Sequence, residues 1–429
     1  MDPRQRAFLR GNQHLFADHG QVLAKETESD IAVVGAGPAG LAAALALAHA
    51  GANVALIGPP PRPESPQLLD TRTAALLVSS VDMLKALGLW EALLPHAAPL
   101  KAIRILDDGG GLFRAPDVGF AAAELGLEAF GYNIANSVLV ETLYALAASA
   151  LGALEPSIVD RIELTPGSAI VHLKEDRQIT ARLVVGADGR HSICRKQAGI
   201  GVSERRTEQA AIATSFAHVL PHRGVSTELH RRGGSVTTVP LTDPLASSLI
   251  WVGETREIDG LMALDGPSFG NALAARLDGF LGPIGAVGAR AHFPVTPLAA
   301  DSLAGRRTAL VGEAGHILPP IGAQGLNLGL RDAATLADCV GTALRSRGDP
   351  GSDEVLSAYD GARRIDVVTR TLGIDLLSRS LLTGFLPLQA ARGIVSHGLN
   401  ALPPLRRLVM RIGMAPPTEL PSLMRPTAS

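Results

Sequence analysis

Residues 311–333, "VGEAGHILPPIGAQGLNLGLRDA", combine residue types that can bind a large polar ligand. Glu313 follows a strand-like run where the carboxyl edge of a parallel sheet would lie, the edge at which such sheets bind ligands. Its carboxylate can accept hydrogen bonds from the hydroxyls of a sugar or ribitol chain. Gly325, Leu326 and Asn327 begin a helix whose unpaired backbone N–H groups can stabilise negative charge on a nearby ring. The simpler interpretation is an ordinary strand, loop and helix in which Glu313 is solvated.

A second glycine-rich segment, "DIAVVGAGPAGLAAALALAHAGANVALIG", lies near the start of the chain. It divides into a strand over 31–34, a tight turn, an alanine-rich helix and a second strand over 53–57. Gly35, Gly37 and Gly40 occupy the G-x-G-x-x-G positions, which permit the turn, the approach of a pyrophosphate and close packing of helix and strand. This context predicts a dinucleotide site at the helix N-terminus.

One feature of such sites is missing. An acid at the end of the second strand usually holds the adenosine ribose, but Gly58 stands there and "PPPRPESP" follows. Backbone groups or Arg62 would have to supply these contacts, or the adenosine end is held less tightly.

Composition excludes several other classes of protein. The net charge of −2 gives no electrostatic footprint for nucleic acid, so no nucleic-acid partner is expected. Cys194 and Cys339 lack the spacing of a zinc or redox motif and are interpreted as reduced thiols of an intracellular protein; no metal is predicted. Residues 1–29 lack the apolar core of a secretory signal and are expected to be a poorly structured extension. Residues 31–58 could span a membrane by length, but their glycine turn and alanines favour a buried strand and helix.

The pattern of predicted elements changes at about residue 204. Short strands follow over 204–295, which indicates a separate antiparallel sheet. The other predicted elements are a helix from Thr73, a hairpin over 101–115, a helix over 136–148, a buried strand in "ARLVVGADGRHS" and a helix over 268–281.

The segment "GPSFG", residues 266–270, matches the nucleophile elbow of serine hydrolases. An elbow needs a buried strand before it, whereas "MALDGP" precedes this one and Ser268 stands where a helix N-cap would. A hydrolase that uses Ser268 is therefore a distant alternative.

Four blocks give the chain a specific resemblance: "VVGAGPAG", "DTRTAAL", "VVGADGRHSICR" and "LVGEAGHILPPIGAQGLNLGLRDA". Over about residues 30–415 it resembles the flavin-dependent aromatic monooxygenases of the p-hydroxybenzoate hydroxylase fold, and among them the ubiquinone-biosynthesis hydroxylases. The resemblance implies an α/β fold in which a Rossmann-like FAD-binding domain is interleaved with an antiparallel-sheet substrate domain, followed by C-terminal helices. The predicted boundaries are 30–100, 130–203 and 296–345 for the FAD-binding domain, 101–129 and 204–295 for the substrate domain, and 346–429 for the C-terminal helices.

The resemblance also assigns cofactor contacts, although the related proteins usually carry Asp where Glu313 stands. No catalytic residue is predicted, and His316 is interpreted as a structural histidine. The implied roles are pyrophosphate binding by Gly35, Gly37 and Gly40, a flavin contact by Arg72, contacts to both FAD and NAD(P)H by Asp188 and Gly189, ribitol binding by Glu313, and contact with the pyrimidine edge of the isoalloxazine by the amides of Gly325, Leu326 and Asn327.

The implied activity is hydroxylation of a polyprenylated phenol in ubiquinone biosynthesis. NAD(P)H, a transient reductant, would reduce the flavin, oxygen would add at C4a, and the hydroperoxide would deliver one oxygen to the ring. The alternatives are a hydroxylase of a small soluble phenol, an FAD-dependent prenyl reductase and a non-enzymatic scaffold of a quinone-biosynthesis complex.

The C-terminal segment "RRLVMRIGM" mixes arginine with apolar residues at helical spacing. A basic amphipathic helix can lie on an anionic membrane surface, which predicts a cytoplasmic protein peripheral to the inner face of the membrane. A helix packed on its own domain with a solvated basic face fits the pattern equally well. A complex with other quinone-biosynthesis proteins is also expected from the resemblance.

Overall fold

A computed structural model describes residues 26–61, 71–107, 117–174, 176–231, 234–320, 322–382, 397–414 and 419–426. Most of the predicted N-terminal extension, residues 1–25, lies outside the described residues, as does Arg62. Residues 26–29 differ from the expectation because they begin the first strand, β1 (Glu26–Val34), where they pair with 178–181.

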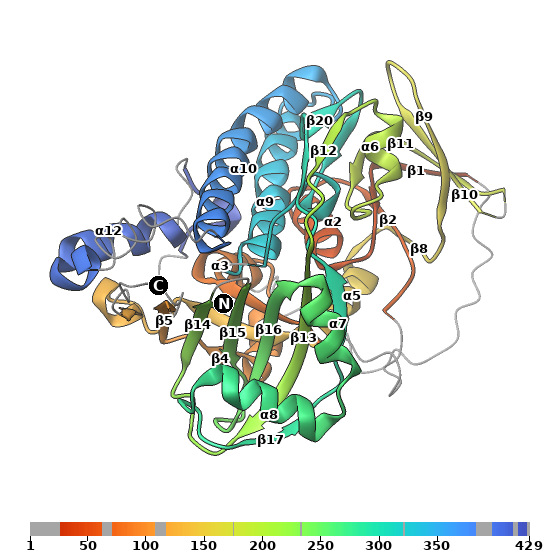
Figure 1. Cartoon of the computed structure of the whole chain (residues 1–429). Helices are drawn as coiled ribbons and strands as arrows, with labels where there is room; N and C mark the ends of the chain where they lie inside the picture. The colour runs from red at the N-terminus through yellow and green to blue at the C-terminus, as the bar shows by residue number, and fades with distance from the viewer. Residues whose placement is uncertain are drawn as a thin grey trace.

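The first sheet has a parallel centre, in the order β20-β21-β11-β1-β2-β8 (Figure 1). Val33 on β1 pairs with Val185 on one side and with Leu56 on the other. A parallel sheet has to be covered on its faces, and the alanine-rich helix α2 (Pro38–His49) is buried against it. The other strands are β2 (Val54–Ile57), β8 (Ala153–Glu155), β9 (Val159–Leu164), β10 (Ala169–Leu173), β11 (Gln178–Gly186), β20 (Ala304–Gly305) and β21 (Thr308–Leu310).

The second sheet has the order β17-β13-β16-β15-β14-β5-β6, with β18 also paired to β13. Helices α7 (Thr255–Ala263) and α8 (Gly266–Leu277) cover one of its faces, where Leu249 and Trp251 pack with Phe269 (Figure 1). The strands are β5 (Ala102–Asp107), β6 (Val118–Ala121), β13 (Gln209–His218), β14 (Val225–Arg231), β15 (Gly234–Pro240), β16 (Ala246–Glu254), β17 (Ile284–Val287) and β18 (Ala291–Pro294).

Smaller elements join these sheets and cover them. The short strands are β3 (Thr73–Leu77), β4 (Ala98–Pro99) and β7 (Gly131–Ala135) in one small sheet, and β12 (Val202–Glu204), β19 (Leu298–Ala300) and β22 (His316–Ile317) in another. The remaining helices are α3 (Val78–Ala86), α4 (Trp90–Leu93), α5 (Asn136–Ala150), α6 (Ile193–Gln197), α9 (Gln324–Arg345), α10 (Asp353–Leu382) and α12 (Pro403–Met414), with single turns η1 (Leu94–His96), η2 (Ala122–Leu125), η3 (Gly312–Ala314) and η4 (Ser422–Met424).

The α/β class predicted from the sequence is confirmed, but two local predictions were wrong. The segment from Thr73 begins as strand β3, because it pairs with the distant strand β7 before α3 starts at Val78. The helix expected over 268–281 is α8, and it ends earlier because Asp278 turns left-handed at φ 52°. Helix α7 was not predicted. The domain boundaries stay a prediction.

The hairpin expected over 101–115 is described only in part. Strand β5 pairs antiparallel with β6, Ile103 opposite Phe120, while residues 108–116 lie outside the described residues. Helix α12 packs against this strand pair through Met410, which contacts the cluster around Val118 and Phe120. Within the described ranges, no helix is long and apolar enough to cross a membrane.

Candidate functional site

The glycine turn after β1 leaves room for a ligand at one position and none at the other two. A Cβ on Gly35 would lie 2.2 Å from the Ala187 carbonyl oxygen, and a Cβ on Gly40 would lie 1.9 Å from that of Gly35. A Cβ on Gly37 would have no described atom within 4 Å, and no described side chain caps the start of α2. The unpaired N–H groups of α2 therefore face open space beside Gly37, as a pyrophosphate requires.

At the end of β2, where the usual acid is missing, there is no room for a side chain. A Cβ on Gly58 would lie 2.7 Å from the backbone nitrogen of Ala36, so a side chain would press on the glycine turn. Glu155 ends the adjacent strand β8, but its carboxylate is buried and lies 2.5 Å from Arg177 Nη1. Glu155, the carboxylate at the end of the neighbouring strand, is therefore already paired with Arg177.

Glu313 lies between the two helices that could hold a dinucleotide. Its neighbour Gly312 adopts φ 62°, and a Cβ there would lie 3.0 Å from Cβ of Ala39 in α2 and 3.9 Å from Cα of Gly329 in α9. The Glu313 side chain is exposed, and no partner for it is found among the described residues. Its carboxylate is therefore available to a ligand that spans the N-terminal ends of α2 and α9.

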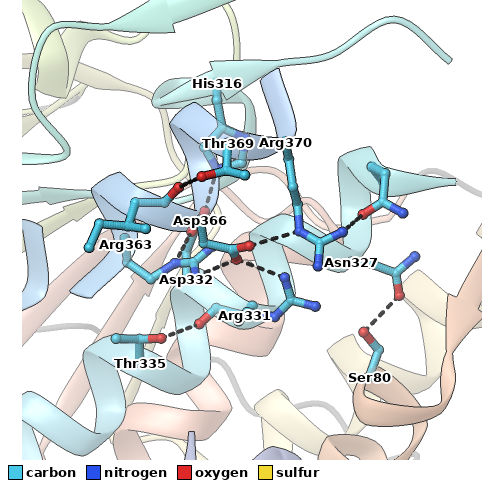
Figure 2. Close-up of polar contacts among 12 residues, drawn as sticks. Ser80, His316, Asn327, Arg331, Asp332, Thr335, Arg363, Asp366, Thr369 and Arg370 are labelled. Atoms are coloured by element: carbon cyan, nitrogen blue, oxygen red, sulfur yellow. Dashed lines mark hydrogen bonds and ion pairs between the residues drawn. The ribbon is translucent and has the colours of Figure 1, made fainter. Parts of the chain in front are cut away.

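The side chain of Asn327 fixes the conformation of the chain at the start of α9. Ala323, which precedes the helix, is left-handed at φ 54°, and its carbonyl accepts a 2.6 Å hydrogen bond from Asn327 Nδ2. The Asn327 side-chain oxygen accepts hydrogen bonds from the Leu77 amide at 2.8 Å and from the Ser80 hydroxyl at 2.7 Å (Figure 2). No described side chain caps α9, so the amides of Gly325 and Leu326 keep unpaired donors. The sequence predicted a role for the Asn327 amide but not for its side chain.

Asp188 shapes the turn after β11. Its carboxylate accepts hydrogen bonds from the Ser192 hydroxyl at 2.5 Å and from the amides of Ile193 and Cys194 at 2.7 and 3.2 Å. These contacts fix the start of α6 beside Gly189, which is left-handed at φ 75°. The structure thus gives Asp188 a conformational task, and its predicted contacts with FAD and NAD(P)H stay a prediction.

A buried network of charged side chains, drawn in Figure 2, contacts the loop of Glu313 through the Gly312 amide. Asp332 on α9 accepts hydrogen bonds from the Gly312 amide at 3.0 Å and from Arg363 Nε at 2.7 Å, and lies 2.6 Å from His316 Nε2. Burial raises the pKa of the Asp332 carboxyl, but the charges of His316 and Arg363 outweigh it, so the net shift is downward. His316 thus links the loop of Glu313 to α9, and its interpretation as a structural histidine stays a prediction.

The same network continues along α10 to the start of α9. Asp366 accepts hydrogen bonds from Arg331 at 2.7 Å, Arg363 at 2.8 Å and Arg370 at 2.8 Å. Arg370 also donates to the Gln324 side chain at 2.7 Å and to the Gly413 carbonyl at 3.2 Å, which ties the start of α9 to α12. Burial opposes ionisation of Asp366, yet the arginines hold the pKa of its carboxyl well below the usual range.

One face of the second sheet contacts the small sheet of β3 and β7 and the residues on both sides of Arg72. The Thr73 hydroxyl lies 3.0 Å from that of Ser248, and the Thr71 hydroxyl donates to the Ala213 carbonyl at 3.2 Å. Asn133 on β7 donates to the Pro240 carbonyl at 2.9 Å. Arg72 is exposed beside these contacts, so it lies at the seam where β13, β15 and β16 meet the dinucleotide-binding unit.

Three other sequence hypotheses can be placed. Ser268 is the third residue of α8 and not its N-cap; Asp265 is the cap, and its carboxylate accepts from the Ser268 amide at 2.8 Å. No buried strand leads into it, which removes the elbow.

Cys194 and Cys339 are separate free thiols, and burial raises the pKa of both, that of Cys339 to about 11. Over the described ranges, no cluster of acidic, histidine or cysteine side chains could hold a metal.

Comparison with known proteins agrees with this geometry. Residues 28–372 match the family described as FAD binding domain. The chain is 33% identical to ubiquinone hydroxylase UbiL of Rhodospirillum rubrum over 92% of each chain, and 33% identical to 3-demethoxyubiquinol 3-hydroxylase of Escherichia coli over 85% of this chain and 93% of that one. Among solved structures, p-nitrophenol 4-monooxygenase PnpA of Pseudomonas putida shares the fold with a TM-score of 0.73, at 18% identity, over 92% of this chain and all of that one.

The Gly37 opening, the uncapped starts of α2 and α9 and the free carboxylate of Glu313 fit FAD, whose pyrophosphate, ribitol and ring need such groups in this order. With a family match over most of its length and two relatives at one-third identity, the chain belongs to the FAD-dependent aromatic monooxygenases, among the ubiquinone-biosynthesis hydroxylases.

Proposed function

We propose that this protein hydroxylates the aromatic ring of a polyprenylated phenol intermediate in ubiquinone biosynthesis, with NAD(P)H as the reductant. The observation that carries the proposal is the line of open binding groups from Gly37 through Glu313 to Gly325, which ends at the seam with the second sheet. The relatives that share one-third of the sequence are named as ubiquinone and demethoxyubiquinol hydroxylases, which supports this substrate class.

In this function each part of the site has a task. The amides at the start of α2 hold the pyrophosphate beside Gly37, and the Glu313 carboxylate accepts hydrogen bonds from the ribitol hydroxyls. The amides of Gly325, Leu326 and Asn327 stabilise negative charge on the pyrimidine edge of the ring. Arg72, at the seam, lies along the flavin. When bound and reduced, FAD supplies the activated oxygen that is transferred to the substrate.

The face of the second sheet that borders this seam forms the substrate wall. Ala211, Val252 and Val295 are buried on it, with Ile250 and Phe293 packed beside them. Small and apolar side chains suit a prenylated ring, and they keep water away from the reacting oxygen.

Helix α12 brings the protein to the membrane that holds such a substrate. Met410 packs inward, while Leu405, Leu408, Val409 and Ile412 are exposed, Ile412 by 65%. Arg407 and Arg411 are exposed on the same helix. Exposed apolar side chains with flanking arginines favour the surface of an anionic membrane, so the protein is peripheral.

The first experiment is mass spectrometry of the quinone lipids in source cells that lack the gene. Accumulation of a prenylated precursor that lacks one hydroxyl group is expected, and its structure identifies the ring position. An unchanged quinone profile, in cells without a second such hydroxylase, would refute the ubiquinone assignment. Turnover of the purified protein with a small phenol, without lipid or detergent, would then favour a soluble substrate.

A further inference from the structure

Strand β14 carries two ionisable side chains on the face of the second sheet that forms the substrate wall. Glu228 pairs with Thr237, which pairs with Ile250, and His230 pairs with Ser235, which pairs with Val252. Residues paired across a sheet point to the same face, and Ser248, two residues before Ile250, contacts Thr73. Glu228 and His230 therefore point toward the wall, away from α7 and α8.

Both side chains are buried, and their polar atoms are incompletely paired. Glu228 is 8% exposed and His230 is 3% exposed. His230 Nε2 lies 3.2 Å from Glu228 Oε1, an ion-pair distance. That carboxylate oxygen and His230 Nδ1 have no hydrogen-bond partner among the described residues. Buried polar atoms are rarely left unpaired, so this pair has the character of a site that a ligand completes.

The residues around the pair place it between the seam at Arg72 and helix α12. On one side, Asn133 fixes β15 to the first unit at Pro240. On the other side, Ile105 of β5, the ladder neighbour of Glu228, belongs to the cluster beneath Met410 of α12. Figure 1 shows α12 beside the β5 and β14 edge of the sheet. A substrate that enters from the membrane beneath α12 would reach β14 on its way to the flavin.

We propose that His230 is a catalytic residue that takes up the proton of the substrate's ring hydroxyl, and that Glu228 is a positioning residue that orients the imidazole. This inference rests on the proposed function. The phenol O–H bond breaks, its electron pair stays on oxygen, and the proton moves to His230 Nδ1, which leaves an imidazolium next to the Glu228 carboxylate. The resulting phenolate has more electron density on its ring, which favours attack on an electrophilic oxygen. The proton returns to the oxygenated product or to solvent.

The test compares two substrates in FAD-loaded enzyme. One is a short-chain prenylated phenol, and the other is its ring-fluorinated analogue, whose hydroxyl is already ionised at the assay pH. His230→Gln should slow hydroxylation of the parent phenol about a hundredfold. On the ionised analogue, which needs no base, the variant should stay within a few-fold of the wild type. Glu228→Gln should show the same selectivity with a smaller loss.

His218→Gln is the matched control. His218 is a buried histidine of the same sheet, 4% exposed, but both ring nitrogens have partners, the Leu220 carbonyl at 2.8 Å and the Ser247 hydroxyl at 3.0 Å. Equal losses of the His230 variant on both substrates, no loss on the parent phenol, or the same selectivity in the control would overturn the inference. If the wild type hydroxylates neither compound, the proposed function fails first, which separates the two outcomes.

Discussion

Gly37 and Gly40 belong to the same turn but have different surroundings. A substitution at each can therefore distinguish an effect on ligand binding from an effect on folding. Gly37 has no described atom near a built Cβ, whereas at Gly40 the Cβ would lie 1.9 Å from a backbone oxygen. We therefore expect the ligand to require the first glycine and the packing of α2 on the sheet to require the second.

Gly37→Ala should leave the unfolding midpoint of the FAD-free protein nearly unchanged and weaken FAD binding by at least tenfold, because the methyl group enters the space of the pyrophosphate. Gly40→Ala should lower the midpoint markedly, because backbone has to move. Thermal unfolding and FAD titration by fluorescence measure both. Similar losses of stability in the two variants would show that Gly37 is also required for packing.

Glu313 is the second residue with a separable role. Since hydrogen bonds to charged groups contribute roughly 1.5–3 kcal/mol, Glu313→Gln should weaken FAD binding about 10- to 150-fold. Glu313→Asp should restore most of the affinity, because it keeps the charged carboxylate on a side chain that is shorter by one methylene group. Titration of the FAD-free variants measures this. A Gln variant with wild-type affinity would place the ribitol contact elsewhere.

At the scale of elements, local sequence and distant pairing predict different things. The glycine turn and the start of α9 were predictable because their signals are contiguous. Strand β3 was not, because its apolar run fits a helix and only pairing with β7 makes it a strand. The two-residue spacing of Glu228 and His230 puts them on one face of a strand, but the sequence does not reveal which face borders the flavin. The buried network was also invisible, because it joins Arg331 and Asp332 of α9 to Arg363 and Asp366 of the separate helix α10.

Helix α12 is the element through which the proposed membrane contact is expected to form. Each large apolar side chain contributes about 1.5–3 kcal/mol when fully buried. The double variant Leu408→Ser with Ile412→Ser should therefore lose at least about tenfold in partition to vesicles of zwitterionic and anionic phospholipid. Sedimentation with the vesicles measures this.

Ile158→Ser with Val202→Ser provides the matched control, because both side chains are exposed, by 57% and 40%, but lie outside α12. It should bind vesicles like the wild type. Removal of the anionic lipid should weaken binding of the wild type, since each arginine near the surface contributes roughly 1 kcal/mol. Equal loss in both double variants would contradict docking through α12.

At the scale of the whole molecule, the buried network links stability to pH. The pKa values of Asp332 and Asp366 are lowered in the folded protein relative to about 3.9 in an unfolded chain. Their contribution to the free energy of unfolding is therefore complete above about pH 4 and is lost as the pH falls toward the folded-state pKa values. The protein should lose stability steeply in that acid range.

Asp366→Asn tests this linkage. The variant leaves three arginines without their shared carboxylate, so the free energy of unfolding at pH 7 should fall by roughly 3–5 kcal/mol. Its decline below pH 4 should also be shallower than that of the wild type. Glu163→Gln, which removes an exposed carboxylate paired with Arg161, should change little. Denaturant unfolding at a series of pH values provides the measurement; a parallel acid decline in wild type and Asp366→Asn would assign it to other groups.

The pairing of the first sheet also has a consequence for biosynthesis. Strand β1 acquires its neighbour β11 only after the early strands of the second sheet have been made, and β11 acquires β21 only when Thr308 meets Val184. A sheet with such distant partners has high contact order and closes slowly. On the ribosome, strands β1 and β2 can pair with each other at once, but their outer edges wait unpaired until β11 and β8 have been translated. During that interval they are exposed to aggregation, and chaperones have their clearest point of action on this protein.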